Sequence, residues 1–142
     1  MSRAELQRFA EDRVVDAEVL LKAGRWQGAY YLSGYAAECG LKSCVLAYQE
    51  RTGIIFKDKS YLESLKRCWT HDLELLLDFA GLKVRRDVDT RANGNLFANW
   101  GTVGQWKETS RYEARTQQQA EAIYDAITHN VDGVLQWIRS FW

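Results

Sequence analysis

The 142-residue sequence contains no proline, and it has only three cysteines and two histidines. Proline removes a backbone donor and breaks helices, so its complete absence permits long uninterrupted helices. Apolar residues recur with a period near 3.6 through most of the chain, which is typical of amphipathic helices. Together these observations predict an all-α fold.

The three cysteines fit neither a disulfide framework nor a zinc site. Their number is odd, and Cys39 and Cys44 are too far apart for a Cys-x-x-Cys metal motif. The sequence also lacks the Gly-x4-Gly-Lys-Ser/Thr loop of P-loop proteins and the His-Glu-x-x-His motif of zinc peptidases. We therefore expect no metal and no cofactor, and we expect the thiols to be buried and reduced.

Charges of either sign are not in excess, since 19 Lys and Arg balance 19 Asp and Glu. The chain therefore has no overall basic field, and any nucleic-acid binding has to come from a local patch. No apolar run approaches the roughly 20 residues that span a bilayer, and the opening segment MSRAELQRFAEDR has no apolar signal core. We expect a single cytoplasmic domain over residues 1–142, with no membrane partner.

Capping patterns and glycines predict the helix boundaries. A first helix is predicted from Arg3 to Ala23, a second from about Arg25 to Arg51, and a last one from about Thr116 to Ser140. The very short connection between the first two makes them an antiparallel hairpin. A shorter helix is expected after Thr70 as N-cap, and residues 83–106 are expected to be a loop with one short helix. The prediction is an up-and-down bundle of four or five helices.

The stretch GYAAECGLKSC, residues 34–44, places small residues inside the second predicted helix. Glycine within a helix costs up to about 1 kcal/mol relative to alanine, so Gly34 and Gly40 indicate that a neighbouring segment approaches closely. Glu38 and Lys42 form an i, i+4 pair, which is worth about 0.2–0.5 kcal/mol on an exposed face. We interpret the stretch as a packing face and not as a catalytic site.

The order of motifs along the chain resembles that of the HEPN family. Family members carry a DA-x-x-LL segment, then A-x6-A-A-E-x-x-L-K-A, then HDL and a late RY. The corresponding residues here are Asp16-Ala17, Leu20-Leu21, Ala29, Ala36, Ala37, Glu38, Leu41, Lys42, His71-Asp72-Leu73 and Arg111-Tyr112. Ser43 stands where the family has alanine. The resemblance covers nearly the whole chain in the expected order.

This resemblance implies a small all-α bundle with a long N-terminal helix hairpin and a long C-terminal helix, assembled as a homodimer. It also implies a role in nucleotide or RNA binding, or as the HEPN partner of a minimal nucleotidyltransferase in a toxin–antitoxin or defence-type system. A non-catalytic binding module of this kind is the function that we expect. The candidate ligand-binding residues are Lys42, Arg67, His71, Arg111 and Tyr112. The dimer surface is expected on the second or the last helix.

The ribonuclease branch of the family carries Arg-x4-6-His, in which the histidine acts on the 2′-hydroxyl and the arginine stabilises the phosphate. Arg67 and His71 have Arg-x3-His spacing, one residue short of the motif, and no arginine stands at the motif positions before His129. The signature is therefore missing. Two alternatives stay open beside the binding module: a metal-independent ribonuclease that uses a displaced Arg67/His71 pair, and a dimerisation scaffold alone.

Basic and aromatic residues also alternate in the middle of the chain. Such residues can bind nucleotides or single-stranded RNA by phosphate contact and base stacking. The set consists of Lys66, Arg67, Lys83, Arg85, Arg86 and Arg91 with Trp69, Trp100, Trp106 and Tyr112. Several aspartates stand in the same region, and tryptophans in small bundles are commonly core residues, so this set is a second candidate surface.

Overall fold

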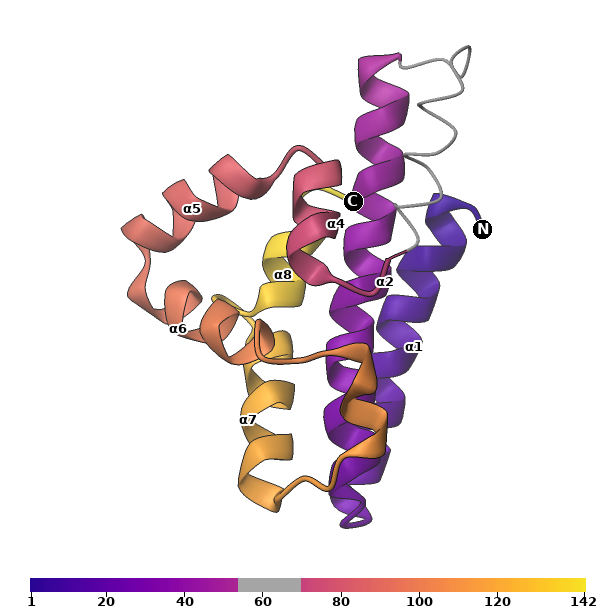
Figure 1. The fold of residues 1–142 in the computed structure, drawn as a ribbon, viewed down its shortest axis with the longest axis vertical. Coiled ribbons are helices and arrows are strands. Elements are labelled where there is room, and N and C mark those ends of the chain that lie inside the picture. The colour runs from indigo at the N-terminus through magenta and orange to yellow at the C-terminus, as the bar shows by residue number, and fades with distance from the viewer. Residues whose placement is uncertain (54–69) are drawn as a thin grey trace.

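The computed structural model describes residues 1–53 and 70–142, and these residues form seven α-helices, one 3₁₀ helix and no strand (Figure 1). The all-α prediction is confirmed, whereas the predicted number of four or five helices is too low. In chain order the elements are α1 (Arg3–Lys22), α2 (Trp26–Thr52), α4 (Leu73–Phe79), α5 (Lys83–Ala92), α6 (Gly94–Val103), the 3₁₀ helix η1 (Glu108–Tyr112), α7 (Gln117–Thr128) and α8 (Val134–Arg139). No helix in these two segments is both long and apolar enough to cross a membrane.

The predicted antiparallel hairpin of α1 and α2 is present. Gly24 adopts a positive φ of 71° after α1, and the Arg25 amide donates a hydrogen bond to the Leu20 carbonyl at 2.8 Å. A left-handed residue at this position turns the chain sharply and satisfies carbonyls at the helix end. At the other end of α2, Gly53 is also left-handed, with φ of 61°. Both boundaries therefore lie where the glycines predicted them.

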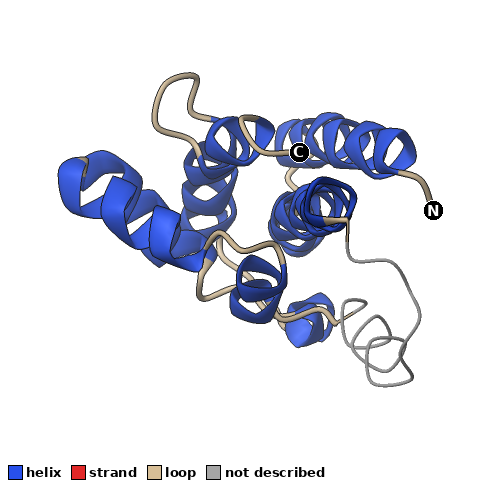
Figure 2. Cartoon of the chain, turned by 90° about the horizontal axis from the view of Figure 1, so that it is seen from above, coloured by secondary structure: helices blue, strands red, loops and turns tan. Residues whose placement is uncertain are grey.

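Helix α2 runs through the middle of the bundle. It packs against α1, α4, α7, α8 and η1, and Figure 2 shows it nearly end-on with the other helices around it. Every residue from Ala36 to Leu41 is buried, so this part of α2 has no solvent face. A helix that is enclosed on all sides has to be built from small and apolar residues, which is the physical reason for the composition of this stretch.

Two glycines of α2 confirm the predicted packing face. A Cβ at Gly34 would overlap with the indole ring of Trp106, and a Cβ at Gly40 would lie 2.9 Å from Cγ2 of Ile138 in α8. The lack of a side chain at Gly34 thus makes room for the Trp106 indole, and the lack of one at Gly40 makes room for α8. Close approach of this kind offsets the helix propensity that glycine lacks.

Local capping agrees with the sequence at two of the helix starts that the structure describes. Ser2 with Glu5 and Thr116 with Gln119 form reciprocal capping boxes. At α4, however, the N-cap is Asp72, whose carboxylate accepts from the Glu74 and Leu75 amides at 3.0 and 3.2 Å. The assignment of Thr70 as N-cap is therefore wrong by two residues.

The predicted last helix is in fact two helices, α7 and α8. The C-cap residue His129 turns away from helical geometry, and its Nδ1 accepts from the Val131 and Asp132 amides. Gly133 lies so close to the His129 carbonyl that a Cβ there would overlap with it. Val131, which would continue the apolar spacing of the predicted single helix, lies in this turn and is 71% exposed. The apolar spacing of the sequence therefore continues across the turn, although the helical backbone is interrupted there.

Residues 83–106 were expected to be mostly loop, and they form the two ten-residue helices α5 and α6. Asn93 separates them and caps α6, since its side-chain oxygen accepts from the Asn95 and Leu96 amides at 3.1 Å. Helix α5 buries only Thr90 and projects from the bundle, as Figure 1 shows. The glycines and asparagines in this segment serve as caps and exposed helix positions, and they do not prevent helix formation.

Candidate functional site

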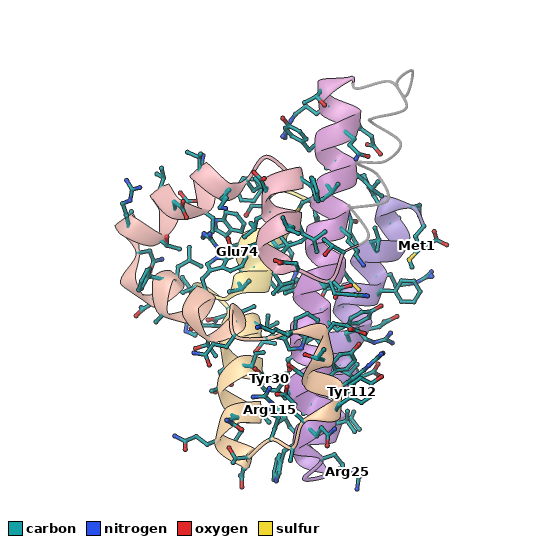
Figure 3. All side chains as sticks on the ribbon, in the orientation of Figure 1. Met1, Arg25, Tyr30, Glu74, Tyr112 and Arg115 are labelled. Carbon is teal, nitrogen blue, oxygen red and sulfur yellow. The ribbon has the colours of Figure 1, made fainter. Side chains whose placement is uncertain are left out.

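A hollow of about 620 Å³ lies where the turn between α1 and α2 meets η1. Its lining consists of Leu20, Gly24, Arg25, Trp26, Gln27, Gly28, Tyr31 and Arg111. Figure 3 shows this end of the molecule, with Arg25 at the tip of the hairpin and Tyr112 on the segment beside it. Arg25, Trp26 and Tyr31, from the start of α2, therefore share one concave surface with Arg111, which is distant in the sequence. We call this surface the Arg25–Arg111 hollow.

The N-terminus of α2 opens into this hollow. Its N-cap residue, Arg25, makes no side-chain capping bond, and the first turn of α2 contains no acidic residue. By contrast, side chains cap four other helices: Ser2, Asp72, Asn93 and Thr116. The first amides of a helix carry partial positive charge and lack partners within it, so this uncapped end favours an anion.

Arg111 is held in place by its own backbone and by its neighbours. Gln27 Nε2 donates to the Arg111 carbonyl at 2.5 Å, which ties η1 to the first turn of α2. The Arg111 guanidinium lies 3.1 Å from Glu108 and 4.7 Å above the Tyr112 ring. Tyr112 itself is 74% exposed and does not line the hollow. Its ring therefore acts on the hollow only through Arg111.

The other arginine of the hollow has no such neighbours. No hydrogen bond or ion pair joins the exposed Arg25 side chain to any residue in the described part of the chain. Tyr31 lies beside Arg111, and burial raises the pKa of its phenol although the nearby arginine lowers it. Tyr31 is therefore neutral at physiological pH, and the hollow has an unopposed positive charge at Arg25 beside a partly neutralised one at Arg111.

A second cluster lies inside the bundle around Glu38 of α2. The Glu38 side chain is fully buried, and its Oε1 accepts from Lys42 Nζ at 2.7 Å and lies 2.9 Å from His71 Nδ1. The other carboxylate oxygen, Oε2, is buried and has no hydrogen-bond partner among residues 1–53 and 70–142. The value of about 0.2–0.5 kcal/mol for an exposed pair therefore does not apply to Glu38 and Lys42. The reason is that α2 is enclosed on every side at this point, so the Glu38 side chain cannot reach water.

The five candidate ligand-binding residues fall into separate places. Lys42 and His71 meet at Glu38, whereas Arg111 and Tyr112 lie together at the edge of the Arg25–Arg111 hollow. Arg67 lies outside the described residues, so the structure does not place the Arg67/His71 pair.

Sequence reasoning missed Arg25, Trp26 and Tyr31 as site residues. One signal in the sequence could have indicated this site: Arg25 stands at the N-cap of a helix, where Ser, Thr, Asp or Asn is preferred.

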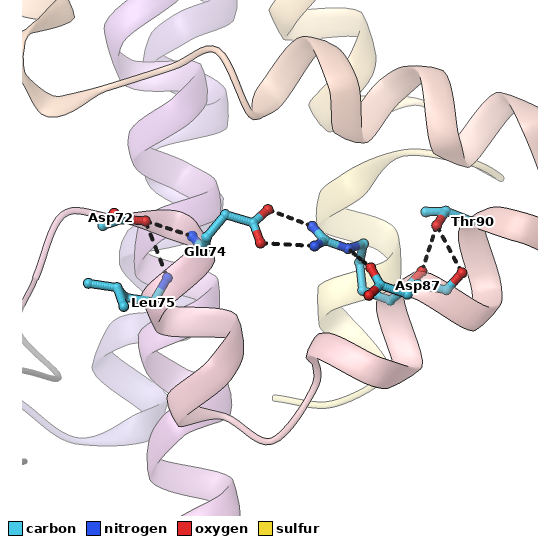
Figure 4. A network of polar contacts seen from close by, with 6 residues as sticks. Asp72, Glu74, Leu75, Asp87 and Thr90 are labelled. Atoms are coloured by element: carbon cyan, nitrogen blue, oxygen red, sulfur yellow. Dashed lines mark hydrogen bonds and ion pairs between the residues drawn. The ribbon is translucent and has the colours of Figure 1, made fainter.

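In the basic and aromatic set in the middle of the chain, two of the arginines already have acidic partners and two of the rings are buried. Arg86 makes a two-pronged ion pair with Glu74, at 2.8 and 2.9 Å, and also contacts Asp87 (Figure 4). Arg85 pairs with Asp89 at 2.9 Å. The rings of Trp100 and Trp106 are core residues, only 5% and 3% exposed. The ion pairs and the burial of the two rings do not support a binding surface at these residues, and binding by the whole set stays a prediction; Lys66, Arg67 and Trp69 lie outside the described segments.

His71 borders another hollow, of about 450 Å³, between α4 and the segment that joins α6 to η1. The other lining residues are Asp72, Leu73, Glu74, Trp100, Gly104, Trp106, Lys107, Glu108 and Thr109. The acidic side chains here already have partners: Asp72 caps α4, Glu74 binds Arg86 and Glu108 binds Arg111. The imidazole of His71 is half-exposed. Its Nδ1 contacts the buried Glu38, and the ring also lines this hollow.

The thiols of α2 are inert at neutral pH. Burial raises the pKa of Cys39 to about 11 and that of Cys44 to about 12, so both remain protonated. The expectation of buried thiols is confirmed for these two, and Cys68 lies outside the described residues. Among residues 1–53 and 70–142 there is no group of three or more side chains that could hold a metal ion.

Comparison of the chain with models of protein families, with curated proteins and with solved structures finds no match in any of the three. The chemistry of the two hollows is therefore inferred from the residues of this chain.

Proposed function

We propose that this chain is a HEPN-like domain that binds nucleotides or single-stranded RNA at the Arg25–Arg111 hollow. One observation carries the proposal: two arginines, two aromatic rings and an uncapped helix N-terminus converge on a single concave surface. The net charge of the chain is zero, so a local site of this kind is what phosphate binding requires here.

Each part of the hollow suits one part of a nucleotide. Guanidinium groups bind phosphate oxygens through charge-assisted hydrogen bonds, and free amides at a helix start add further donors. The half-buried indole of Trp26 offers a ring on which a base can stack, which is worth about 1–3 kcal/mol per base. The Tyr31 ring already stacks on Tyr35 and contacts Trp106, so it borders the base without stacking on it. Stacking of this type is tolerant of sequence, so we expect weak discrimination among bases.

Replacing either arginine by alanine is expected to weaken binding of a short single-stranded RNA by about tenfold or more. The reason is that a hydrogen bond to a charged group contributes about 1.5–3 kcal/mol. Fluorescence anisotropy with labelled RNA and with labelled ATP would measure the affinities of Arg25→Ala, Arg111→Ala and the double variant. Each removed phosphate contact should also lower the slope of log affinity against log salt by about 0.7.

Arg91→Ala is the matched control, because Arg91 is an exposed arginine on α5, outside the hollow. It should bind RNA and ATP like the unaltered chain. Equal loss in Arg91→Ala and Arg25→Ala would mean that binding depends on overall charge and not on the hollow. Absence of RNA and ATP binding by the unaltered protein at low salt would refute the proposed function.

A second candidate function, RNA cleavage, is favoured by the geometry of His71. A buried carboxylate that holds one imidazole nitrogen leaves the other directed outward, and this is how bases are oriented in hydrolytic sites. If His71 removes a proton from a ribose hydroxyl, His71→Ala should lower the rate of RNA cleavage by about a hundredfold or more. His129→Ala is the control, since His129 is exposed at the end of α7. Equal cleavage by both variants, or none by the unaltered chain, would exclude this role.

A further inference from the structure

Helix α5 has little stability of its own. It is ten residues long, whereas isolated helices shorter than about 12–15 residues are marginal in water. Its N-cap residue, Leu82, provides no side-chain cap, and its first turn contains no acidic residue and begins with Lys83. A cation at this position is unfavourable because it meets the positive end of the helix dipole. Helix α5 therefore depends on its contacts with the rest of the bundle.

Little apolar surface of α5 takes part in those contacts. Thr90 is the one buried residue of the helix, and its hydroxyl donates to the Arg86 carbonyl within α5 itself. The large apolar side chains of α5, Val84 and Val88, are 77% and 51% exposed. Burial of apolar surface is the main force that holds packed helices together, and α5 has little of it.

Polar contacts to α4 and α8 hold α5 instead. Arg86 binds both carboxylate oxygens of Glu74 in α4, at 2.8 and 2.9 Å (Figure 4), and its guanidinium lies 5.3 Å from the centre of the Trp100 ring. Asp89 accepts a hydrogen bond from Trp137 Nε1 in α8 at 2.9 Å. Arg86 and Asp89 are three residues apart and therefore share one face of α5.

Both ends of α5 are held independently of these contacts. Leu82, before the helix, is buried, and its amide donates to the Leu77 carbonyl at 2.9 Å. Asn93, after the helix, caps α6 and donates to Asp132 Oδ1 at 2.7 Å. The ten residues between these ends can therefore unfold while α4 and α6 keep their own hydrogen bonds. Segments with few buried apolar contacts open in this way at a free energy below that of global unfolding.

Helix α5 also forms part of the wall of a hollow of about 410 Å³, a volume typical of small-molecule sites. Asp89 and Ala92 come from α5, and Leu96 of α6 and Trp137 of α8 are among the other lining residues. When α5 unfolds, the hollow loses this part of its wall. The rings that Arg86 and Asp89 contact, those of Trp100 and Trp137, then become more exposed to solvent.

We propose that α5 is a lid that unfolds locally between its fixed ends at Leu82 and Asn93 and thereby opens this hollow. The closed form is held by the contacts of Arg86 with Glu74 and of Asp89 with Trp137, and the open form keeps the rest of the bundle folded. The proposal is independent of nucleotide binding, since no residue of α5 lines the Arg25–Arg111 hollow.

Hydrogen exchange of single backbone amides in the full chain, followed by NMR, tests the lid. The amides of residues 87–92 should exchange at least about a hundredfold faster than the buried amides of α2, because they do not wait for global unfolding. Glu74→Gln weakens the partner of Arg86 and leaves the sequence of α5 unchanged. It should speed exchange of the α5 amides by about three- to tenfold.

Glu11→Gln is the matched control. Glu11 also binds an arginine, Arg139, through both carboxylate oxygens, at 2.7 and 2.8 Å, but this pair joins α1 to α8. Its loss weakens the closed and the open forms of the lid equally, so it should speed exchange in α2 and leave the α5 amides unchanged. If α5 exchanged as slowly as α2, or responded equally to both variants, α5 would open only with the whole bundle and the proposal would be overturned.

Thiol labelling then tests whether the hollow opens with the lid. Leu96 is 5% exposed and lines the hollow, so the thiol of Leu96→Cys should react with a maleimide only in the open form. Adding Glu74→Gln should raise the labelling rate by the same factor as the α5 exchange rate, whereas adding Glu11→Gln should not raise it. A labelling rate that does not follow α5 exchange would show that the lid does not control the hollow.

Discussion

Lys42→Met is expected to lower the free energy of unfolding by about 3–5 kcal/mol, because it leaves the carboxylate of Glu38 buried without its cationic partner. Glu38 is fully buried and Lys42 is only 11% exposed in its side chain, so water cannot replace the lost ammonium group. Among the described residues, the carboxylate would keep its contact with His71 alone, and its Oε2 has no hydrogen-bond partner there. Urea denaturation followed by circular dichroism would measure the loss.

A matched pair of variants separates the effect of burial from that of the helical ion pair. Glu18 and Lys22 of α1 have the same i, i+4 spacing, but their side chains are 47% and 75% exposed. Lys22→Met, measured in dilute protein, should therefore change stability by at most about 0.5 kcal/mol. The double variant Glu38→Leu/Lys42→Met should recover most of the stability, since both buried charges are gone. An equal loss in Lys42→Met and Lys22→Met would contradict the burial of Glu38.

Gly34→Ala is expected to destabilise the protein although alanine is the better helix former. An added Cβ would overlap with the ring of Trp106, which is 3% exposed and donates its Nε1 hydrogen bond to the Tyr31 carbonyl at 3.1 Å. The indole would have to leave its site or α2 would have to shift. Overpacking of this kind costs about 1–3 kcal/mol and sometimes more. Thermal unfolding monitored by tryptophan fluorescence would report both the loss of stability and the displaced ring.

Gly101→Ala is the control for Gly34→Ala, and we expect it to increase the stability of the protein. Gly101 is an exposed position inside α6, and an added Cβ there would meet no atom within 4 Å. Alanine should therefore stabilise the protein by up to about 1 kcal/mol through helix propensity alone. If both glycine variants stabilised the protein, the close packing of Trp106 on α2 would be refuted.

Local sequence signals predicted the features that neighbouring residues control. The hairpin of α1 and α2, its left-handed glycines and the capping boxes at Ser2 and Thr116 depend on hydrogen bonds that span only a few residues. The same signals failed for residues 83–106 and for the division between α7 and α8. In the first case, asparagine and glycine serve as caps and exposed positions as well as loop residues. In the second case, apolar periodicity continues across a turn, and only the hydrogen bonds of His129 reveal the break.

The sequence by itself determined that the chain is all-α, that it begins with a helical hairpin and that α2 needs close neighbours. The absence of proline, the apolar period and the small residues of α2 are sufficient for these conclusions because each acts through the local backbone. Tertiary structure alone decided that Glu38 is buried and that Arg25 and Arg111 share a hollow. The burial of Glu38 and the meeting of the two arginines depend on which helices pack against each other. The spacing of residues along one helix does not show which helices those are.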